Sequence, residues 1–161
     1  MADTPDTERG AAPAAYACML VRRPAAEVFR AFTEPEVTTR FWYTRSSGPM
    51  RPGAALRWDW ETYGASAEVR VTEVEDDRRI RFEWGNATRP TTVEMRFTPR
   101  TGHPGDATFV EVTETGFDGT GAELVGWLND TVGGFTTVLC AVKALLEHDL
   151  DLRAVPDHHP A

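Results

Sequence analysis

Residues 121–148 read GAELVGWLNDTVGGFTTVLCAVKALLEH, and their apolar side chains recur at spacings of three and four. This period predicts one long amphipathic helix, about 40 Å in length at 1.5 Å per residue. Thr120 and Glu123 have the spacing of a capping box at its start. The expected inner stripe is Leu124, Leu128, Thr131, Phe135, Val138, Val142 and Leu145, widened by Trp127, Leu139 and Leu146. Such a helix needs a broad apolar surface to cover.

Five segments before this helix alternate between apolar and polar residues with a period of two. They are LRWDW (56–60), EVRV (68–71), IRFEW (80–84), VEMRF (93–97) and FVEVTETGF (109–117). This alternation predicts an antiparallel sheet with one buried face and one charged, solvated face. Trp58, Trp60 and Trp84 fall on its apolar side. A long helix on a tryptophan-lined sheet can enclose an apolar cavity.

An apolar strand over YACMLV (16–21) and two short helices are expected before this sheet. The first helix starts at Arg23-Pro24, and Thr33 with Glu36 forms a capping box for the second. Residues 1–14 and 151–161 have no periodicity and are interpreted as tails. The sequence therefore predicts one α+β domain over residues 15–150.

Charge and composition argue against several classes of protein. With 17 Lys plus Arg against 25 Asp plus Glu, the net charge of −8 argues against nucleic acid as a partner. No apolar run approaches ~18 residues, so we expect no membrane insertion and a cytoplasmic protein. The histidines lack zinc-ligand spacing, and no phosphate-binding or dinucleotide-binding glycine motif occurs, so neither a metal nor a cofactor is expected.

Glu114 is the sharpest single candidate, because strand parity places it with Val110 and Val112 on the apolar face. Burial there would raise its pKa, which suits a general acid or base or a ligand anchor. Alternatively, the side chain reaches solvent at the strand end or binds a backbone amide near Gly116. It is the one weak candidate for a catalytic residue.

Large aromatic side chains supply the other candidates for a ligand site. The expected ligand-binding residues are Trp42, Trp58, Trp60, Trp84, Glu114, Trp127, Leu128 and Phe135. Tyr43, Asn129 and Asp130 could add contacts, although every aromatic residue here could equally serve a packed core. Gly133-Gly134 inside the helix suggests close packing, a tolerated bend or a loosened segment over the cavity mouth.

Four segments resemble a known family: RRPAAEVFRAFTEPEVTTRFW (22–42), EVEDDRRIRFEW (73–84), VTETGF (112–117) and GW (126–127). They are similar to the START-like superfamily, the polyketide cyclase and lipid-transport group, and within it to homologues of the activator of the ninety-kilodalton heat-shock protein ATPase. The resemblance covers about residues 15–150. It implies a helix-grip fold, in which a curved antiparallel sheet wraps around a long C-terminal helix and two short helices follow the first strand.

The resemblance leaves three functions open, because this scaffold serves many. The first is a non-enzymatic module that binds a small apolar or amphipathic ligand. The second is a chaperone-associated regulator of an ATPase, which rests on the resemblance alone. The third is a cyclase or hydrolase-type enzyme that uses Glu114. Either a monomer or a homodimer is expected.

Overall fold

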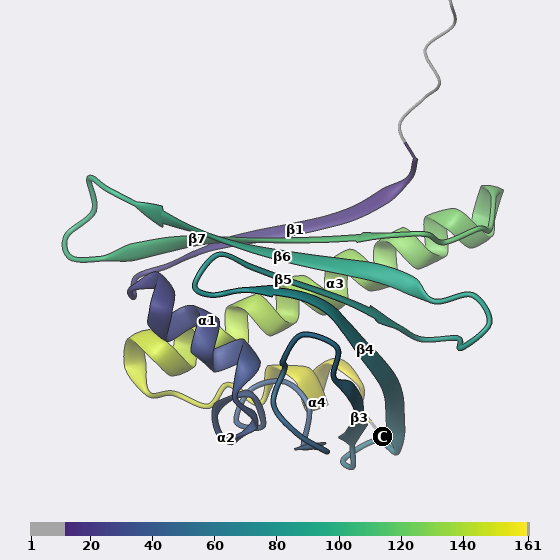
Figure 1. The fold of residues 1–161 in the computed structure, drawn as a ribbon, viewed down its shortest axis with the longest axis horizontal. Helices are drawn as coiled ribbons and strands as arrows, with labels where there is room; N and C mark the ends of the chain where they lie inside the picture. Colours follow the sequence, from purple (N-terminus) through teal and green to yellow (C-terminus); the bar gives the residue numbers. More distant parts are fainter. Residues whose placement is uncertain (1–11, 161) are drawn as a thin grey trace, which may run out of the picture.

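Seven strands form one antiparallel sheet in the order β1-β7-β6-β5-β4-β3-β2 (Figure 1). The computed structural model describes residues 12–160, so most of the expected N-terminal tail lies outside the described residues. The elements are β1 (Ala14–Val21), α1 (Ala25–Thr33), α2 (Pro35–Thr38), β2 (Arg45–Ser46), β3 (Ala55–Trp60), β4 (Ala65–Glu75), β5 (Arg79–Trp84), β6 (Thr91–Arg100), β7 (Ala107–Thr115), α3 (Gly121–His148) and α4 (Ala154–His158). The sheet curves around α3, and α1 and α2 follow the first strand. The predicted α+β helix-grip fold is confirmed.

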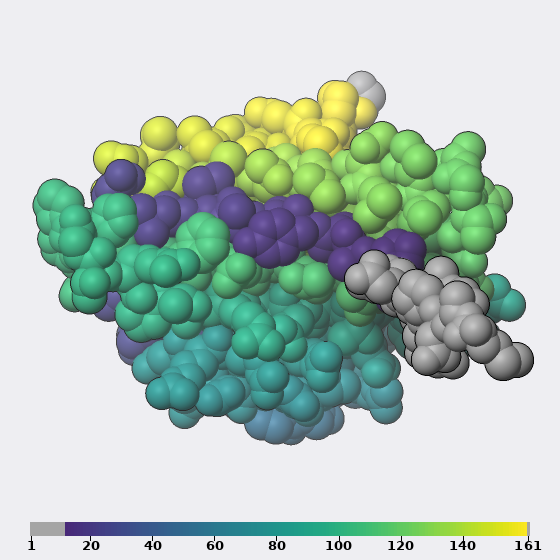
Figure 2. All heavy atoms as spheres, turned by 90° about the horizontal axis from the view of Figure 1, so that it is seen from above, coloured from purple at the N-terminus to yellow at the C-terminus, as the bar shows by residue number. Residues whose placement is uncertain are grey.

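The long helix α3 begins at the predicted residue but packs on the core through only its second half. Its buried residues are Phe135, Val138, Leu139, Ala141, Val142 and Leu145. In the first half Val125 is 56% exposed and Trp127 is half-buried. Seen from above, α3 lies alongside the purple strand β1 (Figure 2). Because the first half of the helix is not buried in the core, space remains between that half and the sheet.

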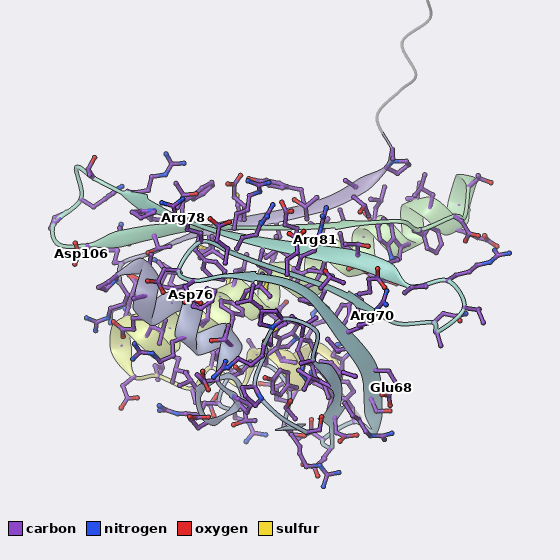
Figure 3. The ribbon with its side chains drawn as sticks, viewed as in Figure 1. Glu68, Arg70, Asp76, Arg78, Arg81 and Asp106 are labelled. Carbon is purple, nitrogen blue, oxygen red and sulfur yellow. The ribbon has the colours of Figure 1, made fainter. Side chains whose placement is uncertain are left out.

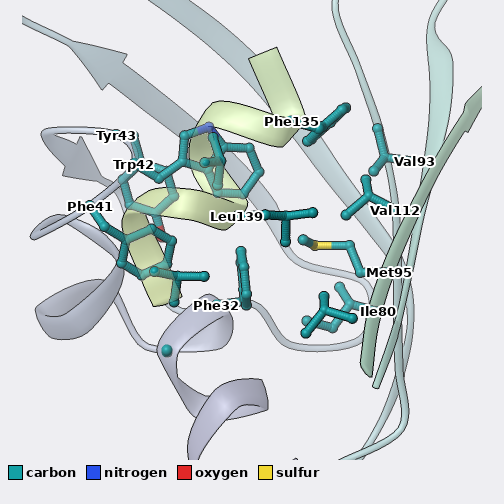
Figure 4. Close-up of a cluster of buried hydrophobic side chains, with 14 of the residues drawn as sticks. Phe32, Phe41, Trp42, Tyr43, Ile80, Val93, Met95, Val112, Phe135 and Leu139 are labelled. Carbon is teal, nitrogen blue, oxygen red and sulfur yellow. The ribbon is translucent and has the colours of Figure 1, made fainter. Parts of the chain in front are cut away.

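An aromatic core holds α3 between the N-terminal helices and the sheet (Figure 4). Leu139 lies between Trp42 on one side and Met95 and Val112 on the other. Trp42 contacts Trp58, with ring centroids 5.0 Å apart. Each such buried side chain contributes about 1.5–3 kcal/mol to the free energy of folding.

The expected capping boxes do not form. Thr120 is the N-cap residue of α3, but its side chain makes no capping hydrogen bond. Thr33 is the last residue of α1 and is buried, so Glu34 becomes the N-cap of α2. Pro35 still starts that helix, because a first-turn residue needs no N–H donor.

One carboxylate expected on the solvated face is buried instead. Asp59 is 8% exposed because the two-residue strand β2 pairs beside it, with Arg45 opposite. Arg45 Nε and Arg57 Nε lie 3.3 Å and 3.1 Å from its carboxylate oxygens. A strand this short has no detectable period, so the sequence pattern did not reveal it. Elsewhere the outer face is charged, with exposed side chains such as Glu68 and Arg70 (Figure 3).

The final residues form structure where a tail was expected. After Asp149 and Arg153, both in left-handed backbone conformation, the chain turns back as α4 and packs on α3. Val155 in this helix is only 5% exposed. The pattern missed it because a five-residue helix offers less than two turns in which a period could appear.

Both cysteines sit in apolar runs of the sequence, which favour burial, yet Cys18 is exposed. It lies on the outer face of the edge strand β1, beside Tyr16. Cys140 on α3 is half-buried, and both thiols are free. None of the helices between residues 12 and 160 is long and apolar enough to cross a bilayer.

Candidate functional site

A pocket of about 720 Å³ lies between the inner face of the sheet and the first half of α3. The β3–β4 hairpin, the β5–β6 hairpin and the C-terminal end of β7 form its border on the side of the sheet. The aromatic lining comprises Trp42, Trp60, Tyr63, Trp84, Phe117, Trp127 and Phe135. The polar lining comprises Asn86, Arg89, Thr91, Glu114, Asp118, Asp130, Thr131, Thr137, His158 and His159. Most of the lining area is apolar, and the polar groups lie among the aromatic rings and at the rim.

Small residues on opposite walls create this space. Ala65 and Ala67 on β4 lie on one wall, and Gly134 on α3 lies on the other. Gly134 follows Trp127, Asp130 and Thr131 at helical spacing, so it belongs to the pocket-facing stripe. A Cβ on Gly134 would meet no atom within 4 Å beyond its own turn of helix.

This geometry revises one interpretation of the glycine pair. The helix is continuous from Gly121 to His148, so it passes through Gly133 and Gly134 unbroken. Close packing does not explain the pair, because an added Cβ would meet only the His158 ring, 3.9 Å from Gly133. The physical effect of Gly134 is to leave volume in the pocket.

Glu114 occupies the inner face of β7, as strand parity predicts. Its side chain is 4% exposed, and it lies opposite Val93 on β6. Thr91 Oγ1 donates to Glu114 Oε1 at 2.5 Å, and Trp84 Nε1 donates to the same oxygen at 3.0 Å. In residues 12–160 neither bond reaches Oε2, and no other side-chain donor does. One carboxylate oxygen is thus anchored, and the other remains available to the pocket.

The electrostatics around Glu114 favour its neutral form more than solvent does. Burial raises the pKa of Glu114, and the hydrogen bonds from Thr91 and Trp84 lower it only in part. Within the described part of the chain no cationic side chain forms an ion pair with it; the one arginine of the pocket lining, Arg89, pairs with Asp118. Glu114 is therefore a buried carboxyl group held by neutral donors.

Ring contacts fix the pocket walls. Trp84 stacks on Phe135, with centroids 5.9 Å apart, which joins the sheet to α3. Phe117 stacks on Trp127 at 5.0 Å, which joins the segment after β7 to the start of the helix. Contacts of this kind are worth about 0.5–1.5 kcal/mol beyond the burial of area. The aromatic side chains are thus held in place before any ligand binds.

Most of the residues expected at a ligand site come together in this pocket. Trp42, Trp60, Trp84, Glu114, Trp127 and Phe135 line it. Trp58 is fully buried beneath Tyr43, on which it stacks at 4.7 Å, and does not line the pocket. Leu128 is half-buried on α3 outside the lining, and Asn129 is exposed. Asp130 reaches the rim.

Several lining residues were missed by sequence reasoning. Thr91 could have been found, because it shares the parity of Val93 and Met95 on β6. Tyr63 and His159 carried no such signal. They lie in a turn and at the chain end, yet their ring centroids approach to 4.4 Å at the pocket rim.

Among residues 12–160, no group of three or more His, Cys, Asp or Glu side chains could hold a metal ion.

Comparisons with known proteins agree with this architecture. The family model described as Activator of Hsp90 ATPase homolog 1-like protein matches residues 22–147. No curated protein matches the chain significantly. A solved structure from Staphylococcus saprophyticus shares 28% sequence identity at a TM-score of 0.72, covering 88% of this chain and 96% of that one.

Two further structures are similar at lower sequence identity. The Aha1 dimer from Colwellia psychrerythraea has 14% identity and a TM-score of 0.68, over 84% of this chain and 97% of that chain. An HSP90 activator from Plasmodium falciparum has 18% identity and a TM-score of 0.64, over 83% of this chain and 95% of that chain. At such identities the similarity establishes a shared fold.

Proposed function

The chain belongs to the family of Activator of Hsp90 ATPase homolog 1-like proteins, and on that premise we propose that it is a non-enzymatic module that binds a small apolar or amphipathic molecule. The observation that carries this proposal is the pocket of about 720 Å³ between the sheet and α3. Pockets that bind small molecules typically measure about 300–1,000 Å³ and combine apolar walls with a few polar groups. The aromatic walls and the buried Glu114 match that description.

The surroundings of Glu114 support binding over catalysis. A general acid–base mechanism needs a second group that moves a proton or activates a nucleophile. The two groups within hydrogen-bond reach of Glu114 are a threonine hydroxyl and an indole N–H. Both stabilise the carboxylate, and neither is an acid or base near neutral pH. Among the described residues, no second acid or base therefore lies within hydrogen-bond reach of Glu114, as a cyclase or hydrolase reaction at this residue would require.

Binding of a neutral, apolar fluorescent dye such as N-phenylnaphthylamine tests the proposal. Ligand in the pocket would lie against Trp42, Trp60 and Trp84, so we expect saturable binding at one site with quenching of tryptophan fluorescence. Native mass spectrometry of the protein as purified would then show whether a molecule is retained. Absence of saturable dye binding at protein concentrations up to the millimolar range would overturn the proposal.

Regulation of a chaperone ATPase is a second candidate function, and the description of the matching family favours it. The expected result is a change in the ATP turnover of a cognate Hsp90 when this protein is added. Turnover that stays constant up to a saturating concentration removes this candidate. The two functions are separable, because the dye assay contains no chaperone.

A further inference from the structure

We propose that the pocket selects ligands that carry a protonated amine beside an aromatic or branched apolar body, with the amine on Glu114 Oε2. This inference rests on the proposed binding function and names the chemical class of the ligand. Three observations carry it: the unshared carboxylate oxygen, the aromatic walls and the balance of charge around the pocket.

The first observation is the geometry of the carboxylate. Glu114 is 4% exposed and lines the pocket, while both of its protein donors, Thr91 and Trp84, bind Oε1. Oε2 has no protein donor within residues 12–160, and it is not among the fully buried atoms, so it borders the open space of the pocket. A ligand with an N–H donor would bind this oxygen directly from the pocket. An ammonium group does so most strongly, since it adds a charge-assisted bond.

The second observation is the aromatic wall of the pocket into which Glu114 faces. Trp84, whose N–H is held by Glu114, stacks on Phe135 and approaches Trp42 at 6.1 Å between ring centroids. Trp60 lies 6.5 Å from Trp84. The faces of indole rings attract cations, most strongly where water is excluded. A carboxylate bonded to one indole of an aromatic cluster is therefore suited to an organic ammonium group and to the apolar body attached to it.

The third observation is the balance of charge on the described lining. Arg89 is the only lysine or arginine there, and Asp118 already neutralises it. Asp130 on α3 adds a further carboxylate at the rim, where within residues 12–160 no ion pair to it is formed. His158, the last residue of α4, and His159, which follows it, also line the pocket. An anionic ligand would meet these carboxylates without a free arginine or lysine to receive it.

Three probes with one skeleton test the assignment: naphthylethylamine, naphthylethanol and naphthylacetate. Isothermal titration calorimetry on the full chain near neutral pH should give the amine a dissociation constant about tenfold lower than that of the alcohol, as expected for one added charge-assisted hydrogen bond. The acetate should bind most weakly. The melting temperature checks that the Glu114→Gln variant folds. In this variant, the ratio of the dissociation constant of the alcohol to that of the amine should fall toward one.

The wild-type comparison needs no variant, so the test stands even if Glu114→Gln fails to fold. An amine that binds no more tightly than the alcohol overturns the assignment, and so does an unchanged preference in Glu114→Gln. If the alcohol or the neutral dye binds in these experiments, the proposed binding function survives. If neither the probes nor the dye bind, both the binding function and the ligand class are wrong.

Discussion

Thr91 and Glu114 share a hydrogen bond of 2.5 Å between Oγ1 and Oε1, formed between the neighbouring strands β6 and β7. Thr91 stands opposite Trp84 on β5, whose indole binds the same oxygen. Three adjacent strands thus contribute to holding one buried carboxyl group. The arrangement fixes the orientation of Glu114 without placing a charge next to it.

Replacing Thr91 by valine should lower the free energy of unfolding by about 1 kcal/mol, because an isosteric side chain removes a donor from a buried carboxylate. The pKa of Glu114 should rise further, since this hydrogen bond lowers it. Urea denaturation gives the first quantity, and a carbon-13 NMR titration of the carboxyl group gives the second. Thr92→Val on the same strand is the matched control and should move neither. A Glu114 pKa that falls in Thr91→Val would contradict the assignment.

Replacing Glu114 by glutamine should stabilise the protein at neutral and higher pH. Because burial raises the pKa of Glu114, the ionised form is disfavoured in the folded state above that pKa. The penalty disappears as pH falls through the raised pKa toward the ordinary value of 4.5, where the carboxyl is protonated in both states. Glutamine carries no charge and keeps a carbonyl oxygen for Thr91 and Trp84. The gain should therefore be present at pH 8 and absent near pH 4.

Thermal or urea unfolding of both proteins across this pH range checks the prediction, since other titrating groups cancel in the difference. Glu36→Gln, at an exposed position of α2, is the control for removal of a surface carboxylate and should give a smaller difference. A destabilisation by Glu114→Gln that grows with pH would mean that the carboxylate is stabilised in the folded protein, contrary to the expectation.

The fold was predictable because both helix and strand periods are strict. A period of two assigns each side chain to a face, and Glu114 followed from Val110 and Val112 by that rule. The same rule failed for Asp59, because its burial depends on β2, a strand of two residues. An element that spans fewer than two of its own periods carries no detectable signal, which also explains why α4, with five residues, was not foreseen.

The sequence predicted only in part which residues line the pocket. Parity places Trp58 and Trp60 on one face, but it does not give their depth. Tyr43 covers Trp58, so that side chain belongs to the core, whereas Trp60 reaches the pocket. Which of two equivalent residues borders a cavity depends on the loops and helices that pack above the sheet, and these contacts are long-range.

Replacing Tyr43 by phenylalanine should leave the stability unchanged or raise it by about 1 kcal/mol, because it removes a buried hydroxyl without a partner. Tyr43 is 1% exposed, and its Oη has no hydrogen-bond partner among the described residues. Burial raises its pKa to about 12; the Thr38 and Ser46 hydroxyls lie nearby and offset this rise in part, but they bond backbone carbonyls and form no hydrogen bond with Tyr43. The ring still stacks on Trp58 in the variant. Denaturation by urea measures the change.

The matched control is Tyr16→Phe, where the hydroxyl donates to Glu111 at 2.8 Å on the exposed face of the sheet. This variant should lower the free energy of unfolding slightly, because the hydroxyl of Tyr16 forms a hydrogen bond and that of Tyr43 does not. A loss of more than about 1 kcal/mol in Tyr43→Phe would show that the hydroxyl is satisfied in solution, by water or by a moved neighbour.

Replacing Gly134 by leucine should abolish dye binding while keeping or raising the melting temperature. The new side chain enters open space in the pocket, where an added Cβ meets no atom within 4 Å beyond its own turn of helix. It also gains about 1 kcal/mol in helix propensity relative to glycine. We expect at least a tenfold loss of affinity for the neutral dye, since the leucine occupies volume that the dye needs. Fluorescence titration and thermal unfolding give the two measurements.

Gly126→Leu separates filling of the pocket from a general effect on the helix. Gly126 lies on the same helix, has equally open space around its Cβ and does not line the pocket. It gains the same helix propensity, so its melting temperature should rise as well, while its dye affinity should stay within about twofold of the wild type. Equal loss of binding in both variants would mean that the dye depends on the mobility of the first half of α3. Unchanged binding in Gly134→Leu would mean that the ligand lies elsewhere, because Gly134 lines the pocket.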